Sequence, residues 1–193
     1  MPLYSDPPRV ETVTDGELDA PVVELDAPVV LSDARGTRDR ALDRLAGTLV
    51  HRLFQLGWQT LPDEAQAARH MARLARPEEL VDVPDAGQFF AGAARAFLTL
   101  SGRSDVRAWL ASGQPHYEVP FSFIAPGRQD VVVRGAIDCL VARPEGGFQV
   151  LEFKTGAPRP EHAHQLDTYL AAVRHAFPGA AVTGELVYPE PGD

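Results

Sequence analysis

Apolar residues recur every three or four positions through the first half of the chain. The first such stripe runs from Ala41 to Phe54 and predicts an amphipathic helix, whose first turn Ser32 or Asp33 would cap. Three further helices are predicted, with proline or glycine between them, at residues 63–76, 85–100 and 104–111. We interpret residues 62–112 as a helical insertion between the first helix and a sheet.

The period of the apolar residues changes to two from Pro115 onward. It predicts three strands, at residues 116–124, 130–141 and 148–154. Short turns at Pro126-Gly127 and Gly146-Gly147 would join them into an antiparallel meander. A helix over 161–177 and a strand over 181–188 follow, and a strand, helix, strand passage within one sheet makes the closing strand parallel to its neighbour. The fold class is therefore α/β.

The first 33 residues differ from the rest of the chain. They are rich in Pro, Asp and Val, and they contain a tandem heptapeptide, since 17–23 is repeated as 24–30. Proline in each copy excludes a heptad helix. We expect an acidic extended linker or arm over 1–33 and one folded domain over 34–193.

Charge and composition limit the function classes. The net charge is −9, of which residues 1–33 carry −7, so the folded part is close to neutral and general electrostatic gripping of nucleic acid is disfavoured. The single Cys139 excludes a disulfide framework and a four-cysteine iron-sulfur cluster within the chain. No apolar run approaches the length of a membrane span, and no signal peptide is recognisable. We expect a cytoplasmic protein without membrane contact.

The candidate chemistry lies between Gly135 and Thr155. Asp138 ends one apolar run, and Glu152 and Lys154 belong to the next, on the same face of a predicted strand. Lys154 is the only lysine, whereas the other seventeen basic residues are all Arg. A lone lysine indicates a demand for a compact ammonium group. Two carboxylates and one ammonium at neighbouring strand ends would hold a divalent metal beside a phosphate.

The same residues have a plainer interpretation. Glu-x-Lys tripeptides are common, and Asp138, Glu152 and Lys154 could form a salt-bridged trio at a sheet edge. His51 on the first helix could likewise be an ordinary surface histidine. Gly47, four residues earlier on the same side of that helix, indicates close approach of another backbone or a ligand.

The ordered set of motifs resembles the PD-(D/E)xK nuclease superfamily over about residues 38–188, and more closely the RecB/AddA-type nuclease domain of bacterial helicase-nucleases. The motifs, in chain order, are Gly47-x-x-x-His51, Glu118 in a strand, Gly135-x-Ile137-Asp138, Glu152-x-Lys154-Thr155-Gly156 and Gln165-Leu166-x-x-Tyr169. The resemblance implies a restriction-endonuclease-like core and metal-dependent hydrolysis of DNA.

The resemblance also implies roles for individual residues. His51, Asp138 and Glu152 would bind Mg²⁺ or Mn²⁺, and Lys154 would assist the attacking water. Gln165 and Tyr169 would line the active site and contact the substrate or the lysine, while Glu118 matches an acidic position of the family. We expect His162 and His164, near the start of the same helix, to be solvent-exposed or capping residues.

These expectations define a function and its rivals. We expect a metal-dependent DNA exonuclease domain that acts on DNA ends or single strands in double-strand break repair. The chain's only lysine is preceded by Phe153, so no phosphate-binding Gly-Lys-Ser/Thr loop exists, and a helicase or translocase, fused or in complex, would supply the motor. The alternatives are a non-catalytic nuclease-like module that binds DNA or a partner, and a structure-specific or restriction endonuclease.

Overall fold

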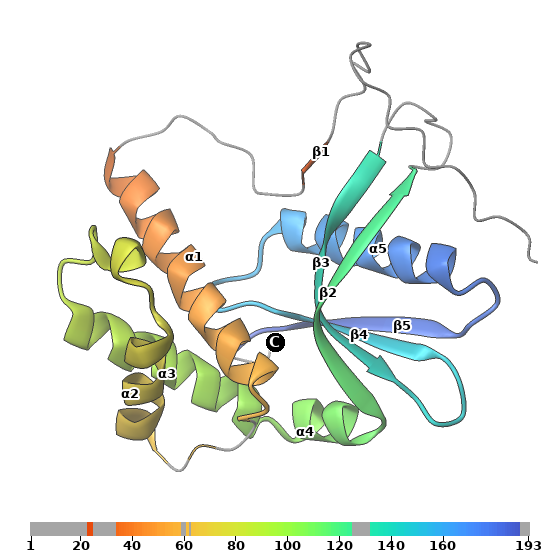
Figure 1. The fold of residues 1–193 in the computed structure, drawn as a ribbon, viewed down its shortest axis with the longest axis horizontal. Helices are drawn as coiled ribbons and strands as arrows, with labels where there is room; N and C mark the ends of the chain where they lie inside the picture. Colours follow the sequence, from red (N-terminus) through yellow and green to blue (C-terminus); the bar gives the residue numbers. More distant parts are fainter. Residues whose placement is uncertain (1–22, 25–33, 59–60, 62, 125–131, 190–193) are drawn as a thin grey trace, which may run out of the picture.

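The protein is described from a computed structural model, which covers residues 23–24, 34–58, 61, 63–124 and 132–189. Within this part of the chain, helices pack on both faces of one mixed sheet (Figure 1). The strands are β1 (Val23–Glu24), β2 (Gln114–Ile124), β3 (Val132–Ala142), β4 (Phe148–Phe153) and β5 (Val182–Val187). The helices are α1 (Ala34–Gln55), α2 (Glu64–Leu74), the 3₁₀ helix η1 (Pro77–Leu80), α3 (Ala86–Gly102), α4 (Ser104–Ala111) and α5 (Pro160–Ala176). None of the described helices is long and apolar enough to cross a membrane.

The sheet has the predicted topology. β2, β3 and β4 form an antiparallel meander, and β5 lies parallel to β4 after the α5 crossover. β2 pairs with β3 from Val132 to Ala142, whereas β4 pairs only with Cys139–Ala142. β1 adds parallel pairs at Val133 and Arg134. The mixed α/β fold and the parallel closing strand are therefore confirmed.

The sequence-based boundaries need local corrections. Asp63 and Asp85 are caps whose carboxylates accept a backbone N–H of the first turn, so α2 and α3 begin one residue later than predicted. α2 ends at Leu74, and the 3₁₀ helix that follows was not predicted. β2 begins two residues early, at Gln114.

Several expectations at the ends and turns lie outside the described residues. The cap of α1 at Ser32 or Asp33 and the turn at Pro126-Gly127 are among them. Of residues 1–33, the structure describes only Val23 and Glu24, which form the short parallel strand on β3.

The larger core layer fixes α1 against the sheet. Phe54 of α1 is fully buried and stacks on Phe153 of β4, with ring centroids 4.3 Å apart and an interplanar angle of 7°. Phe54 also packs against Phe97 of α3, with centroids 5.0 Å apart. Because residues three and four apart on a helix share a face, this packing directs His51 toward the same end of β4. The helical insertion is thus part of the support for α1.

A second core layer holds α5 on the opposite face of the sheet. Tyr169 and Val173 of α5 pack against apolar residues of β3 and β4, namely Ile137, Leu140 and Val150. Gly184 of β5 permits this close packing, since a Cβ there would lie 2.9 Å from the side chains of Leu166 and Leu170. The sheet is therefore covered on both faces, and side chains on either face of β4 are shielded from water.

An ion pair links α1 to the helical insertion and leads to a prediction about acid stability. Both terminal nitrogens of Arg52 donate to the carboxylate of Glu79, at 2.8 and 2.6 Å, and Arg76 N–H donates to the same group. The Arg52 hydrogen bonds, and then that of Arg76, lower the pKa of Glu79 to about 2. A carboxylate with a lowered pKa stabilises the fold at pH values above its unfolded pKa, and this contribution is lost as the pH falls toward 2.

Glu79→Gln is expected to reduce the free energy of unfolding at pH 7 by about 2 kcal/mol, since one charge-assisted partner is lost. The deficit should shrink as the pH is lowered from about 5 toward 3. Urea unfolding at a series of pH values measures it. The exposed neighbour Glu78 is the matched control, and Glu78→Gln should change stability by less than about 0.5 kcal/mol. A deficit that is constant with pH would contradict the prediction.

Candidate active site

The two strands that carry the predicted acidic residues separate where those residues begin. The β3–β4 ladder ends at the pair Cys139↔Leu151, so Asp138 and Glu152 lie just beyond the last pair. Asp138 Oδ2 accepts the backbone N–H of Phe153 at 2.9 Å, a donor that the interrupted ladder leaves available. The Asp138 side chain thus lies between the diverging strands and is 8% exposed. Burial raises its pKa, against the opposing charges of His51 and Lys154.

Glu152 is the more deeply buried carboxylate. It is 1% exposed, and neither of its oxygens has a hydrogen-bond partner of good geometry, although Lys154 Nζ lies 2.5 Å from Oε1. Burial, and next the nearby charge of Asp138, raise its pKa to about 8. The Lys154 ammonium offsets only part of the cost of ionising so deeply buried a carboxylate, and a second cation nearby would lower that cost further.

His51 reaches this pair of strands from α1. Its Nε2 lies 3.3 Å from Asp138 Oδ2 and 3.3 Å from the carbonyl oxygen of Phe153, while its Nδ1 lies 3.4 Å from Glu118 Oε1. Burial lowers the pKa of His51, but Asp138, Glu118 and the Phe153 carbonyl outweigh it and raise the pKa to about 9. Both ring nitrogens of His51 therefore face oxygen atoms.

No other backbone segment of the described residues approaches Gly47, one turn before His51, closely, and the approach of a ligand there stays a prediction. A Cβ at Gly47 would lie 3.7 Å from Thr155 Oγ1, which is ordinary van der Waals contact. The glycine thus faces the segment after Lys154, but alanine would fit equally well, so no protein group requires the glycine there.

A chain of hydrogen bonds from α5 holds the lysine. Lys154 Nζ donates to Gln165 Oε1 at 2.7 Å, and Gln165 Nε2 donates to the Tyr169 hydroxyl at 2.7 Å. Burial, and next the charge of Glu152, raise the pKa of Tyr169, so its hydroxyl stays protonated. The Lys154 ammonium group is therefore fixed between the Glu152 carboxylate and the side-chain amide of Gln165.

The seven predicted site residues thus come from α1, β2, β3, α5 and β4 together with Lys154, the residue that follows it. A model of the PD-(D/E)XK nuclease superfamily matches residues 30–191, which include every one of them. The chain belongs to this superfamily. Membership implies phosphodiester hydrolysis, so the protein is a nuclease of the hydrolase class. None of the curated proteins compared with the chain matches it significantly.

The residues of this nuclease fit a divalent cation. Asp138, His51 and Glu118 each offer a ligand atom, and these atoms lie within 4.8 Å of one another. The superfamily resemblance assigns Glu152, rather than Glu118, as the third ligand; the Glu152 carboxylate lies outside that group of three and contacts Lys154. Carboxylate oxygens suit a hard cation, and the buried carboxylate of Glu152, which has the Lys154 ammonium on one oxygen, would supply further negative charge for such a cation to balance.

One contact near the nuclease site was not predicted. His162 of α5 lies with its Nδ1 2.9 Å from the hydroxyl of Tyr188, the residue that follows β5. Burial, and next the charge of Lys154, lower the pKa of His162. His162 is therefore partly buried rather than a solvent or capping residue, whereas His164 is exposed as predicted. Only the β4–β5 register places Tyr188 here, and no sequence motif signals it.

Proposed function

We propose that the chain is a metal-dependent DNA exonuclease domain of the RecB/AddA type, working with a helicase in DNA end processing and double-strand break repair. The observation that carries the proposal is a pair of contacts at the point where β3 and β4 separate: His51 Nε2 lies 3.3 Å from Asp138 Oδ2, and Lys154 Nζ lies 2.5 Å from Glu152 Oε1. The hydrogen-bonded pair Gln165–Tyr169 supports it, because it matches the helix motif of that nuclease type.

Each residue has a role in this proposal. His51, Asp138 and Glu152 would hold Mg²⁺ or Mn²⁺, which when bound activates water and stabilises charge on the phosphoryl oxygens. Lys154 orients the attacking water and offsets the negative charge that develops on the phosphate. Gln165 keeps the Lys154 ammonium in place through the 2.7 Å hydrogen bond. Phe153 and Phe54 exclude water from beneath the site through their stacked, buried rings.

The charge distribution supports the proposal that the nuclease domain depends on a helicase to hold and move DNA. Outside residues 1–33 the chain holds 19 acidic and 17 basic residues, so it offers few unbalanced cations to hold a polyanion. Arg52 and Arg103, two of the cations that the structure describes, are already paired with Glu79 and Asp105. Residues 1–33 would be an arm preceding the nuclease domain of 34–193. A fused or bound helicase would bring DNA to the site and supply movement along it.

The digestion of linear and circular single-stranded DNA tests the exonuclease mode. The protein with Mn²⁺, supplied with end-labelled linear DNA, is expected to release short products progressively, while circular DNA of the same sequence stays intact over the same time. The physical reason is that a strict exonuclease requires a free end. Gel analysis of both substrates provides the measurement.

Two other results would replace the proposal with its rivals. Cutting of the circle at a rate similar to that of the linear strand would indicate an endonuclease. Failure to cut any DNA form, combined with no heat of binding on titration with Mn²⁺, would indicate a non-catalytic module that binds DNA or a partner.

A further inference from the structure

The backbone of β2 departs from regular strand geometry at one residue. Tyr117 pairs with Cys139 and Val119 with Ile137, but the intervening Glu118 and Asp138 are not paired. Glu118 has φ of 50°, and among the described residues no other non-glycine residue has a positive φ. Such a conformation is sparsely populated and persists where the surroundings fix it, commonly at functional sites.

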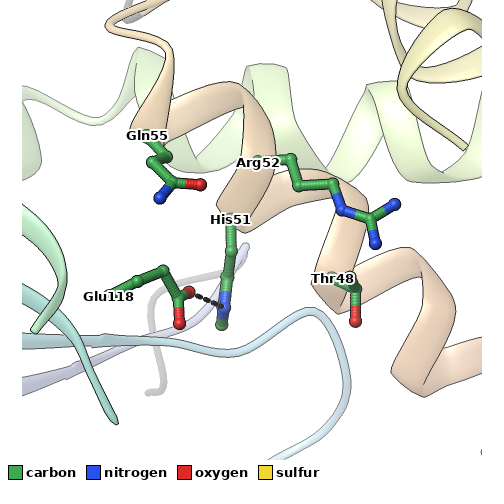
Figure 2. A pocket seen from close by; sticks show the side chains of 5 residues that line it. All are labelled: Thr48, His51, Arg52, Gln55 and Glu118. Atoms are coloured by element: carbon green, nitrogen blue, oxygen red, sulfur yellow. Dashed lines mark ion pairs between the residues drawn. The ribbon is translucent and has the colours of Figure 1, made fainter. Parts of the chain in front are cut away.

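At Glu118 the side chains of β2 also switch from one face of the sheet to the other. Tyr117 packs on the core layer beneath α1, whereas Val119 packs on the layer beneath α5. Residues two apart on a regular strand share a face, so β2 reverses its faces at Glu118. The reversal allows the half-buried side chains before and after Glu118 to pack on the two core layers while the Glu118 carboxylate extends to His51 (Figure 2).

The two nitrogens of His51 have different surroundings. Nε2 faces two oxygens, from the buried Asp138 and the Phe153 carbonyl, while Nδ1 faces only Glu118 among the described contacts. The ring nitrogens point in different directions, so one cation cannot bind both. The Nε2 side, with the buried carboxylate, is the side suited to a cation.

We propose that Glu118 is a positioning residue that accepts the Nδ1–H of His51 and thereby directs Nε2 to the cation held with Asp138. This inference rests on the metal site of the proposed function. A carboxylate on the far nitrogen of a metal-binding histidine fixes the tautomer and the ring orientation. The local strain of β2 at Glu118 is then explained by the placement of this carboxylate.

The surroundings of Glu118 favour this role over direct ligation. Its side chain is 37% exposed, compared with 8% for Asp138. It lines an open hollow of about 280 Å³ with Thr48, His51, Arg52 and Gln55, four residues of α1 (Figure 2). Arg52 is held by Glu79, so it does not draw the Glu118 carboxylate away from His51. Glu118 is therefore at the rim of the site, on the outer side of the imidazole.

A double-mutant cycle on Mn²⁺ affinity tests the proposal. Glu118→Asn adopts a positive φ readily but is too short to reach His51, whereas Glu118→Gln retains an acceptor oxygen at full length. Calorimetric titration should show Mn²⁺ affinity about 10- to 100-fold lower for Glu118→Asn and a smaller loss for Glu118→Gln. In a His51→Ala background, Glu118→Asn should cause no further loss, because Glu118 acts through His51.

The other outcomes overturn the inference. A further loss of affinity in the His51→Ala background would make Glu118 a direct ligand, and an unchanged affinity for Glu118→Asn would leave it no role at the cation. If the wild-type protein binds no Mn²⁺, the proposed function fails together with this inference; wild-type binding with unaffected Glu118 variants overturns this inference alone. Thermal unfolding of each variant establishes that the proteins are folded.

A spectroscopic measurement adds an independent readout. In Mg²⁺-saturated protein, the ¹⁵N shifts of His51 should show a protonated Nδ1 and an unprotonated Nε2. Glu118→Asn should broaden or shift the Nδ1 signal, and Glu118→Gln should largely restore it. Protonation of Nε2 in the wild-type protein with Mg²⁺ would overturn the proposal.

Discussion

Asp138→Asn is expected to lower the rate of DNA hydrolysis by about 1,000-fold or more and to abolish measurable Mn²⁺ binding. The Asp138 carboxylate lies between the diverging strands β3 and β4 and contacts His51 Nε2. It therefore connects the strands of the site to helix α1. Loss of the cation removes several kcal/mol of stabilisation from the transition state, and each 1.36 kcal/mol is a factor of ten in rate. Single-turnover cleavage of labelled DNA and calorimetric titration measure the two effects.

The fold should survive this substitution. The asparagine side-chain oxygen can accept the Phe153 N–H that Asp138 now accepts, and a neutral amide avoids the burial cost that raises the pKa of the acid. Thermal unfolding of the metal-free variant should therefore stay close to that of the wild-type protein. Asp167→Asn is the matched control, because Asp167 is exposed on α5. Cleavage by Asp138→Asn within tenfold of wild type would refute the assigned role.

The architecture could be predicted because its periodic signals are strong. Leucine and valine at helical spacing defined α1, and the change to a two-residue period at Pro115 defined the meander. The parallel placement of β5 followed from the handedness of a strand, helix, strand connection. The 3₁₀ helix at Pro77–Leu80 escaped prediction because it depends on tertiary contacts, in particular the Arg52–Glu79 ion pair.

The site residues were predictable as types, but their contacts were not. The ordered set of motifs, in which the lone Lys154 follows Glu152 by two residues, predicted the chemistry, while the hydrogen bond to Gln165 depends on how α5 docks on the sheet. The strand separation at Asp138 and the positive φ of Glu118 leave no trace in hydrophobic periodicity, because both residues are polar whichever face they occupy. The contact of Glu118 with His51 therefore needed the three-dimensional structure.

Lys154→Met is expected to separate catalysis from metal binding. The rate of hydrolysis should fall by about 100- to 10,000-fold, the range typical of a group that assists proton transfer or stabilises charge in the transition state. Mn²⁺ affinity should be retained or increased, because Lys154 is not a ligand and its loss leaves Glu152 without its nearest cation. Titration and single-turnover cleavage of the same preparation measure both quantities.

Lys154→Arg should fail almost as completely as Lys154→Met. The ammonium group is held at 2.5 Å from Glu152 Oε1 and 2.7 Å from Gln165 Oε1, in a space that suits a compact charge. A guanidinium is broad and planar and would displace one of these partners.

Arg69→Met, at an exposed position of α2, is the control for Lys154→Met, since it also removes one positive charge from a protein that binds a polyanion. Restoration of the rate by arginine would mean that positive charge alone suffices at this position. Loss of Mn²⁺ binding in Lys154→Met would instead mean that the lysine acts by holding Glu152 in place.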